Sequence, residues 1–545
     1  MAELASPAGP LPHIPDDLTL APFTLDTQHP SRPIRKEGIP WIIEDNSGKK
    51  LGLEELRART FGLANGFSWK YNIILIYSPN HLDYLVTVWA AHRLGAIISG
   101  ANPLYTTDEV VYQINATKAA VLITHPESFE VALSAATLTN MPTNRVILFD
   151  TDAPTKIAVA NQCTVQGLVT MGLAQRPNFV ERRLNPGEGK TKVAFLNFSS
   201  GTTGKPKAVA IAHYAPIANT IQLAAHHKIN EDYCDWEERR IRPGDVYSAD
   251  IYGLVFNTHF SFFCGMPVVL LTKKFNFLEF LNSLQGIHPA VKEYDFSHVR
   301  YLTSAAAPLS RELMERLAEI FPNAHIGQSY GTTESCTVIT TFPLNKKRDL
   351  SGSGGQLIPG VVARVVRPDG SLADFDEPGE LVAKMPSLAL RYEGNPEATT
   401  ETFVDGWLRT GDEVKMNRDG EIFEMLKVRG YQVAPAELEG CLLDHPDVAD
   451  TCVVSIQDDY SGELPLAFVV LHPEAAKRAA SDSRSAEQIK QSIMKHVADN
   501  KVSYKKLAGG VEFIESIPKN PSGKLLRRVL RDKARAMKPK SKVKL

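Results

Sequence analysis

The chain has 545 residues, more than one ordinary hydrophobic core accommodates, so two or more domains are expected. Its 60 Lys and Arg residues are balanced by 62 Asp and Glu residues, which excludes binding of nucleic acid or anionic membrane through a global positive field. The longest apolar run, near residues 262–271, is too short to span a bilayer, so we expect small-molecule partners and no integral membrane segment.

Residues 1–40 are rich in proline and predict an extended arm that runs over the surface. They lack the basic start and apolar stretch of a secretory signal, so a cytoplasmic location is expected. The six cysteines show no CxxC pair or His/Cys cluster of metal-ligand spacing, which predicts reduced thiols.

Helical and strand-like patterns alternate beyond this arm. Residues 73–77 and 268–271 are apolar runs typical of strands, and residues 83–94 and 310–320 have the apolar spacing of helices. This alternation predicts an α/β fold with layered sheets. A turn-rich segment at residues 417–420 precedes a smaller α/β unit, so we place a large ATP- and acid-binding domain at residues 41–420 and a small domain at residues 421–545.

One segment has the composition of a phosphate-binding loop. Two glycines permit backbone N–H groups to converge on an anion, while four hydroxyls and two lysines add donors and positive charge. The candidate phosphate-binding residues are Ser199, Ser200, Gly201, Thr202, Thr203, Gly204, Lys205 and Lys207. Apolar runs at residues 193–198 and 209–211 predict that the loop joins two strands, unlike a Walker A loop. This favours a nucleotide-using enzyme over a flexible surface turn.

The chain ends in a basic stretch. Ten Lys or Arg residues and one acid, Asp532, lie between positions 524 and 545. A packed stripe on a short helix with solvated charges is favoured over nucleic-acid or membrane contact; the stripe residues are Leu525, Leu526, Val529 and Leu530. The last residues, Val543-Lys544-Leu545, are a weak match to a peroxisomal address, so peroxisomal import stays open beside a cytoplasmic location.

Three further motifs follow the loop in order: Gln328-Ser329-Tyr330-Gly331-Thr332-Thr333-Glu334, Thr410-Gly411-Asp412 and Pro518-Lys519-Asn520-Pro521-Ser522-Gly523-Lys524. With the loop, they resemble the adenylate-forming (AMP-binding) superfamily, and within it the 4-coumarate:CoA ligase-like acyl-CoA synthetases, from about residue 40 to residue 533. The resemblance implies a large N-terminal domain of layered sheets and helices and a small mobile C-terminal α/β domain. It also implies an acid-thiol ligase that uses ATP, Mg²⁺ and coenzyme A. A carboxylate would attack the α-phosphate of ATP and release pyrophosphate, and the thiol of coenzyme A would then displace AMP.

The resemblance assigns roles along the nucleotide. The β- and γ-phosphates would be held by Ser200, Thr202, Thr203 and Lys207. Thr333 would contact the α-phosphate, and Glu334 would hold Mg²⁺, a hard ion that favours carboxylate and phosphate oxygens. Tyr330 would lie against adenine; the further nucleotide contacts would be Gln328, Gly331 and Thr332. Taken alone, Glu334 could instead be a loop acid in an ordinary salt bridge.

Other roles belong to residues nearer the C-terminus. Asp412 would accept hydrogen bonds from both ribose hydroxyls, and Lys524 would bridge the attacking carboxylate and the α-phosphate. For the coenzyme A step, the resemblance points to Lys427, Arg429 and Gly430. Each residue also has an ordinary structural interpretation: Asp412 as a turn-capping residue, Lys524 as a solvated lysine and Gly430 as a turn glycine.

The acid pocket would be lined by Tyr252, Ala305 and Gly331, which correspond to family segments around the acyl group. An aromatic wall with small residues favours a planar aromatic acid, such as a cinnamate, benzoate or coumarate, over a long lipid chain. The same residues could equally be ordinary core packing.

Four places are shorter than the family pattern: before residue 73, between residues 246 and 251, between residues 285 and 288, and after residue 423. Asp250 stands where the family usually has histidine, and the last gap removes the expected hinge acid and ribose-binding arginine. Loss of translated segments is favoured over a repacked variant. We therefore expect the chain as written to fold poorly and to adenylate weakly.

Three alternatives to a free-standing CoA ligase remain open. They are an adenylation enzyme that passes the acyl group to a carrier protein, a catalytically impaired nucleotide-binding relative, and a luciferase-like oxygenase. Since the chain ends soon after Lys524 without room for a carrier domain, the free-standing ligase is favoured.

Overall fold

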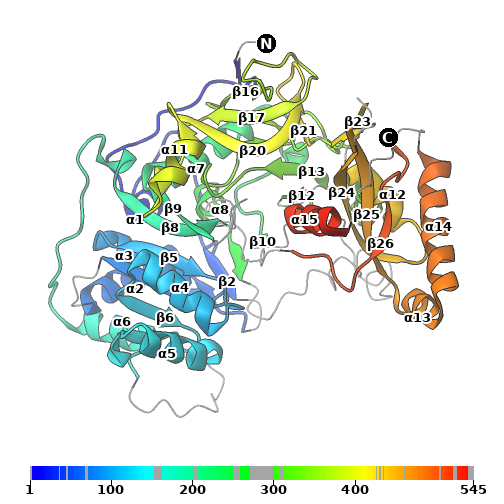
Figure 1. Ribbon diagram of the computed structural model, residues 1–545. Helices are drawn as coiled ribbons and strands as arrows, with labels where there is room; N and C mark the ends of the chain where they lie inside the picture. The colour runs from blue at the N-terminus through cyan, green and yellow to red at the C-terminus, as the bar shows by residue number, and fades with distance from the viewer. Residues whose placement is uncertain are drawn as a thin grey trace.

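The computed structural model describes residues 3–35, 37–44, 47–67, 72–151, 162–199, 206–249, 258–270, 297, 299–305, 311–424, 426–428, 431–433, 435–458, 462–501, 505–519 and 525–537. Helices and strands alternate along these residues, and the strands form several sheets, which confirms the α/β class. Figure 1 shows three neighbouring groups: the blue and cyan N-terminal elements, the yellow sheet of β16 (Val362–Val366), β17 (Gly379–Lys384) and β20 (Trp407–Met416), and the orange and red C-terminal elements.

The largest sheet has seven strands in the order β18, β9, β8, β5, β4, β6, β7. Their bounds are β18 (Arg391–Tyr392), β9 (Lys207–Ala212), β8 (Val193–Ser199), β5 (Ile97–Ala101), β4 (Ile73–Tyr77), β6 (Val121–Thr124) and β7 (Val146–Leu148). Neighbours from β8 to β7 pair in parallel, whereas β9 pairs antiparallel with both β8 and β18. The predicted strand at residues 73–77 is confirmed as β4, whose buried apolar run suits a strand covered on both faces.

Helices pack around these strands (Figure 1). The described helices before β12 are α1 (Leu20–Leu25), α2 (Leu53–Gly66), α3 (Leu82–Arg93), α4 (Thr107–Thr117), α5 (Phe129–Leu138), α6 (Val165–Ala174), α7 (Tyr214–His226) and α8 (Ser261–Phe263), with short 3₁₀ turns at Pro126–Ser128, Thr143–Arg145, Glu188–Lys190 and Trp236–Glu238. Helix α4 begins with a capping box, because Thr106 and Glu109 each accept a hydrogen bond from the other's backbone N–H. The predicted helix at residues 83–94 is confirmed as α3. None of the helices among the described residues is long and apolar enough to cross a membrane.

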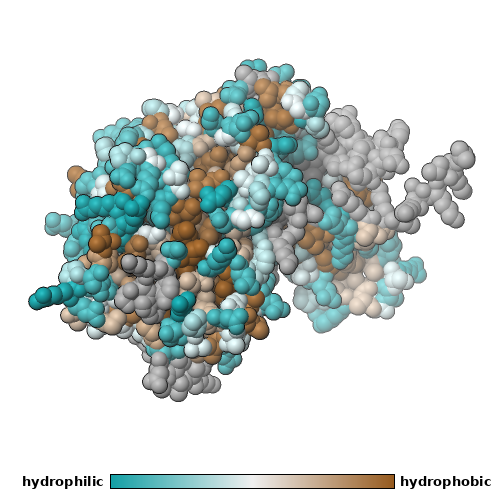
Figure 2. All heavy atoms as spheres, turned by 60° about the vertical axis from the view of Figure 1, so that its left-hand side comes forward, coloured by the Kyte–Doolittle hydropathy of each residue, from teal (hydrophilic) through white to brown (hydrophobic). Residues whose placement is uncertain are grey.

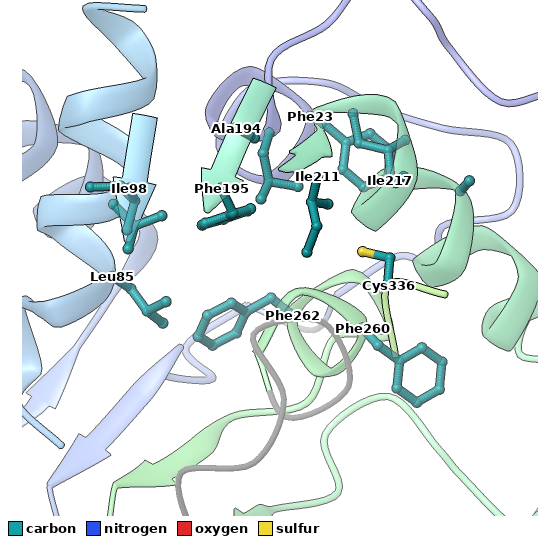
Figure 3. Packing of buried hydrophobic residues seen from close by; sticks show 14 of the residues in the cluster. Phe23, Leu85, Ile98, Ala194, Phe195, Ile211, Ile217, Phe260, Phe262 and Cys336 are labelled. Atoms are coloured by element: carbon teal, nitrogen blue, oxygen red, sulfur yellow. The ribbon is translucent and has the colours of Figure 1, made fainter. Parts of the chain in front are cut away.

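The N-terminal arm differs from its prediction. Strand β1 (Leu4–Ala5) pairs antiparallel with β16, and α1 is buried, with Leu20, Phe23 and Leu25 no more than 2% exposed. Figure 3 shows Phe23 in the same apolar core as Ile211 and Ile217, and the Phe23 ring stacks on Phe263. The prediction of a surface arm is therefore wrong for this part, because its apolar side chains gain more from burial than from exposure.

The described residues before 425 also form three further sheets. The six-stranded antiparallel sheet contains β1, β16, β17, β20, β19 (Phe403–Val404) and β21 (Ile422–Glu424). The two four-stranded sheets are β10 (Tyr247–Ala249), β11 (Val268–Leu270), β2 (Ile42–Glu44), β3 (Lys50–Leu51), and β12 (Tyr301–Ser304), β13 (His325–Tyr330), β14 (Thr340–Thr341), β15 (Gln356–Leu357). Helices α10 (Arg311–Ile320) and α11 (Pro396–Thr402) belong to this part, and α10 and β11 confirm the predicted helix at 310–320 and strand at 268–271.

The C-terminal elements form a smaller α/β unit. They are the hairpin β22 (Leu426–Val428) and β23 (Tyr431–Val433), the sheet β24 (Val448–Asp458), β25 (Gly462–Leu471) and β26 (Gly510–Phe513), and the helices α12 (Pro435–Leu443), α13 (Pro473–Ser481), α14 (Ser483–Asn500) and α15 (Arg527–Met537). The domain boundary near residue 420 stays a prediction. In α15 the apolar stripe is formed by Leu530 and Ala534, whereas Val529 is 50% exposed, so its placement in the stripe is wrong.

Figure 2 shows one face of the molecule, where hydrophilic residues cover most of the surface and brown, hydrophobic residues gather in a band near the middle. The described cysteines include four buried thiols, Cys264, Cys336, Cys441 and Cys452.

Candidate active site

The hairpin of β8 and β9 places the phosphate loop. Ser199, the last residue of β8, pairs with Lys207, the first residue of β9, so the loop between them leaves one end of an antiparallel ladder. The predicted strand-to-strand setting is therefore confirmed. Residues Ser200, Gly201, Thr202, Thr203, Gly204 and Lys205 lie outside the described residues. Pro206 and Lys207 lie where the loop meets β9, and we call this place the neck of the loop. Here the Pro206 carbonyl accepts a hydrogen bond of 2.8 Å from the Tyr112 hydroxyl.

Strand β18 brings Tyr392 to this neck, since it pairs antiparallel with β9. The Tyr392 hydroxyl donates to Glu334 Oε1 at 2.7 Å, and the Lys207 ammonium lies 4.8 Å from the centre of the Tyr392 ring. Tyr392 and Glu334 are 6% and 7% exposed. Burial, together with the neighbouring Glu334 carboxylate, raises the pKa of Tyr392, so the phenol stays protonated and donates the hydrogen bond.

The turn after β13 holds the second motif. Gln328 is buried in β13, and its side-chain amide donates to the Ser353 carbonyl at 3.1 Å. Thr332 and Ser335 close the turn through hydrogen bonds between backbone N–H groups and each other's hydroxyls. Gly331 is required here, because a Cβ atom would lie 1.5 Å from the Thr337 carbonyl oxygen. Thr333 lies within this turn, directly before Glu334, and is half-buried.

The third motif lies in an irregular part of β20. Gly411 has φ +73°, the register between β17 and β20 shifts here, and the Thr410 hydroxyl donates to the Leu381 carbonyl at 2.8 Å. This geometry directs Asp412 toward the second motif, where the Tyr330 hydroxyl donates to Asp412 Oδ2 at 2.7 Å.

Two tyrosines thus connect residues that are far apart in the sequence: Tyr392 contacts Glu334 and Lys207, and Tyr330 contacts Asp412. We call Lys207, Tyr330, Glu334, Tyr392 and Asp412 together the tyrosine cluster. Sequence reasoning missed Tyr392, because only the pairing of β18 with β9 reveals its position. Its local signal was an aromatic residue within a short polar strand, which is not specific.

The other predicted site residues are placed less fully. Ala305 is exposed directly after β12, whose last residue, Ser304, pairs with Gln328. Lys427 lies in β22, opposite Gln432 in β23. Tyr252, Arg429, Gly430 and Lys524 lie outside the described residues, as do Asp250, the gap at residues 285–288 and the C-terminal Val543-Lys544-Leu545.

The tyrosine cluster fits a divalent cation only in part. Among the described residues, no three His, Cys, Asp or Glu side chains gather where they could bind a metal ion. Tyr392 occupies one oxygen of Glu334, and the other oxygen keeps its lone pairs. A Mg²⁺ ion here would therefore depend on a single protein carboxylate and on phosphate oxygens, which is a usual way of binding this ion.

A second buried polar group, the basic cluster, lies elsewhere and consists of His226, His227, Arg240, Tyr301 and His325. Arg240 is 1% exposed; its guanidinium lies 3.9 Å from the centre of the Phe342 ring and donates to backbone carbonyls of residues 342, 343 and 346. Neither ring nitrogen of His227 has a hydrogen-bond partner among the described residues. Burial, followed by the charge of Arg240, lowers the pKa of His226 and of His325 to about 4.

Residues 28–393 match the model of the AMP-binding enzyme family, and residues 437–524 match that of the AMP-binding enzyme C-terminal domain. The chain belongs to the AMP-binding enzyme family. The matched regions contain the phosphate loop, the motif at Glu334 and the motif that ends at Lys524, and four residues of the tyrosine cluster, Lys207, Tyr330, Glu334 and Tyr392, lie in the first of them.

Similar proteins of established name are CoA ligases. This AMP-binding enzyme is 30% identical to 4-coumarate–CoA ligase 5 of Oryza sativa subsp. japonica over 96% of each chain. It is likewise 30% identical to acyl-CoA ligase AKT1 of Alternaria alternata over 96% of each chain. At this level of identity and coverage, the chain is an adenylate-forming acid-thiol ligase, as the sequence motifs predict.

The fold agrees with this assignment. The structure of the anthranilate CoA ligase AuaEII in complex with anthranoyl-AMP superposes with a TM-score of 0.75, at 22% identity and with 96% of this chain and 98% of that chain covered. The predicted fold class, a large domain of layered sheets and helices followed by a small α/β domain, is confirmed.

Proposed function

We propose that this enzyme adenylates a carboxylic acid, with an aromatic acid as the preferred substrate, and transfers the acyl group to coenzyme A. The observation that carries the proposal is the tyrosine cluster, which joins the neck of the phosphate loop to Glu334 and joins Tyr330 to Asp412. Groups suited to phosphate, to a divalent cation and to a ribose thus lie in β9, in the turn after β13 and in β20.

In the first half-reaction, a carboxylate oxygen attacks the α-phosphorus of ATP and the bond to the β-phosphate breaks, so pyrophosphate leaves and an acyl-adenylate remains. Glu334, together with phosphate oxygens, would hold Mg²⁺, which would supply charge neutralisation on the triphosphate. We assign the pyrophosphate side of the site to Lys207 together with Ser199, Ser200, Gly201, Thr202, Thr203, Gly204 and Lys205, where hydroxyls, backbone N–H groups and ammonium groups stabilise the departing charge.

The nucleoside side is assigned to the second and third motifs. Asp412 keeps carboxylate lone pairs beside the Tyr330 hydroxyl and can accept from ribose hydroxyls. Tyr330 presents its ring next to that carboxylate and would lie against adenine, with Gln328, Gly331 and Thr332 forming the surrounding wall. Thr333 would contact the α-phosphate, and Lys524 would neutralise charge between that phosphate and the acid.

In the second half-reaction, the thiolate of coenzyme A attacks the acyl carbon and AMP leaves with its phosphate oxygen. We assign this step to the small domain at residues 421–545, with Lys427 and Gly430 near the pantetheine arm, and we expect that domain to move as a lid between the half-reactions. The large domain at residues 41–420 would keep the nucleotide throughout.

An aromatic substrate is supported by the kinds of acid named for the similar proteins, 4-coumarate and anthranilate. It is also supported by the small side chain of Ala305 directly after β12, which would take up little room beside a flat ring. A cytoplasmic or peroxisomal location remains a prediction from the sequence.

ATP–pyrophosphate exchange across cinnamic, benzoic, phenylacetic and fatty acids tests the proposal, followed by mass detection of CoA thioesters. We expect acid-dependent exchange that is strongest with an aromatic acid, and a matching thioester, even if the shortened segments make the rate low. Strongest exchange with a fatty acid would contradict the aromatic assignment. ATP binding without any exchange would identify a nucleotide-binding relative, and acyl-adenylate without thioester would favour a carrier-protein acceptor.

A further inference from the structure

Tyr392 lies between two opposite charges at the neck of the phosphate loop. Its hydroxyl donates to Glu334 Oε1 at 2.7 Å, and the Lys207 ammonium lies over its ring, 4.8 Å from the ring centre. Within the described part of the chain, Lys207 and Glu334 form no ion pair with each other or with another side chain. An ammonium and a carboxylate therefore contact the same aromatic side chain without neutralising one another.

Tyr392 is held in this place by its backbone and by its neighbours. It pairs with Val209 in the ladder between β18 and β9, and its N–H donates to the Thr399 hydroxyl at 3.1 Å. Its ring packs edge-on against Phe403, with ring centres 5.6 Å apart. On the other side, the Glu334 carbonyl accepts from the Ala389 N–H at 2.8 Å, so the segment just before β18 also anchors the backbone of Glu334.

These contacts of Tyr392 affect how Lys207 and Glu334 are held before the nucleotide binds. Opposite charges in a partly buried environment attract strongly, and a direct ion pair would occupy both groups. A cation–π contact holds the ammonium while its N–H donors remain available. One donated hydrogen bond fixes the carboxylate while leaving its second oxygen to accept or to bind a cation.

We propose that Tyr392 is a positioning residue that keeps Lys207 and Glu334 apart, so that the ammonium stays available to a triphosphate and the carboxylate to its divalent cation. This inference rests on the proposed function. It assigns two separable tasks to one side chain, the ring acting on Lys207 and the hydroxyl acting on Glu334.

The two tasks can be separated with two variants. Tyr392→Phe removes the hydroxyl and keeps the ring, whereas Tyr392→Leu removes both. Mn²⁺ affinity of the enzyme–ATP complex is measured by electron paramagnetic resonance, and ATP affinity without metal is measured by calorimetry in the presence of EDTA. Tyr77→Phe is the matched control, because Tyr77 is equally buried and its hydroxyl donates to the Tyr105 carbonyl at 2.7 Å.

We expect Tyr392→Phe to weaken Mn²⁺ binding by roughly 10–100-fold, as is usual when the hydrogen-bond partner of a metal-binding group is lost, with metal-free ATP affinity unchanged. Tyr392→Leu should weaken both affinities, and Tyr77→Phe neither. Unchanged Mn²⁺ affinity in Tyr392→Phe would overturn the role of the hydroxyl, and unchanged metal-free ATP affinity in Tyr392→Leu would overturn the role of the ring.

Folding of each variant is checked by circular dichroism, and Tyr392→Phe decides the first task even if Tyr392→Leu does not fold. The proposed function fails separately. Wild-type protein that binds ATP and Mn²⁺ but shows no acid-dependent pyrophosphate exchange would overturn the ligase assignment and leave the Tyr392 comparison intact. Folded wild-type protein that binds no ATP would overturn both.

Discussion

The tyrosine cluster and the basic cluster both combine buried and half-buried side chains, yet their charges are compensated in different ways. In the tyrosine cluster, the Asp412 and Glu334 carboxylates each accept a hydrogen bond from a tyrosine hydroxyl. The Lys207 ammonium makes a cation–π contact with the Tyr392 ring. In the basic cluster, three histidines lie near an arginine whose partners among the described residues are backbone carbonyls and aromatic rings. The first arrangement leaves charge available to a ligand, whereas the second suppresses charge on the histidines.

The difference shows that a shifted pKa is a poor guide to the active site of this enzyme. Burial is the main cause of the lowered histidine pKa values at His92, His213, His226, His227 and His325. Three of the four sequence motifs, by contrast, contribute residues to the tyrosine cluster. Burial in a structural core shifts a pKa as strongly as an active-site environment does. The active site therefore has to be identified from the geometry of its residues.

The largest effect on activity is expected from Lys524→Ala. If this ammonium is a preorganised charge beside the α-phosphate, its loss should lower ATP–pyrophosphate exchange by ~10²–10³ without lowering the melting temperature. Exchange at saturating ATP and acid is the measurement. An unchanged rate would remove Lys524 from the catalytic assignment and confine the site to the tyrosine cluster and its loop.

Gly331→Ala tests how tightly the turn beneath Glu334 and Tyr330 is packed. A Cβ atom would lie 1.5 Å from the Thr337 carbonyl, a backbone group that cannot rotate away, so the free energy of unfolding should fall by about 3 kcal/mol. Urea unfolding measures this value. Gly52→Ala is the control, since its Cβ would meet nothing within 4 Å and its φ is negative, at −88°. Equal losses for the two variants would contradict the packing argument.

The basic cluster predicts loss of stability in acid. The folded-state pKa of His226 is about 4, below the ordinary value of about 6.5, because burial disfavours the charged ring. Below pH 6.5 the unfolded chain therefore binds protons that the folded chain does not. The free energy of unfolding should fall as the pH drops from about 6.5 to about 4, by up to ~1.4 kcal/mol per pH unit for each such histidine.

Urea unfolding at several pH values measures this slope, and His227→Phe should make it shallower because one suppressed histidine is removed. His227 suits the test, since its ring makes no hydrogen bond among the described residues. The same slope in wild type and variant would show that the acid sensitivity has another origin.

Much of this architecture was predictable because the signals were local. The phosphate hairpin, strand β4 and helix α3 follow from apolar runs and spacing, and the order of four motifs was enough to predict the family. Burial of α1 was missed because prolines suggested an exposed arm, although Phe23 and Leu25 were apolar. Tyr392 and the basic cluster were missed for a different reason: their partners lie 58 to more than 100 residues away, at Glu334 and Phe342.

The central claim is that ATP binds at the tyrosine cluster and not at the basic cluster. Calorimetric titration of MgATP into wild type, Asp412→Ala and Arg240→Met tests it most directly, with each protein shown to be folded by circular dichroism. We predict that Asp412→Ala weakens ATP binding by roughly 10–100-fold through lost hydrogen bonds to a charged acceptor, and that Arg240→Met leaves the affinity unchanged. The reverse outcome, loss of binding in Arg240→Met with full affinity in Asp412→Ala, would contradict the account.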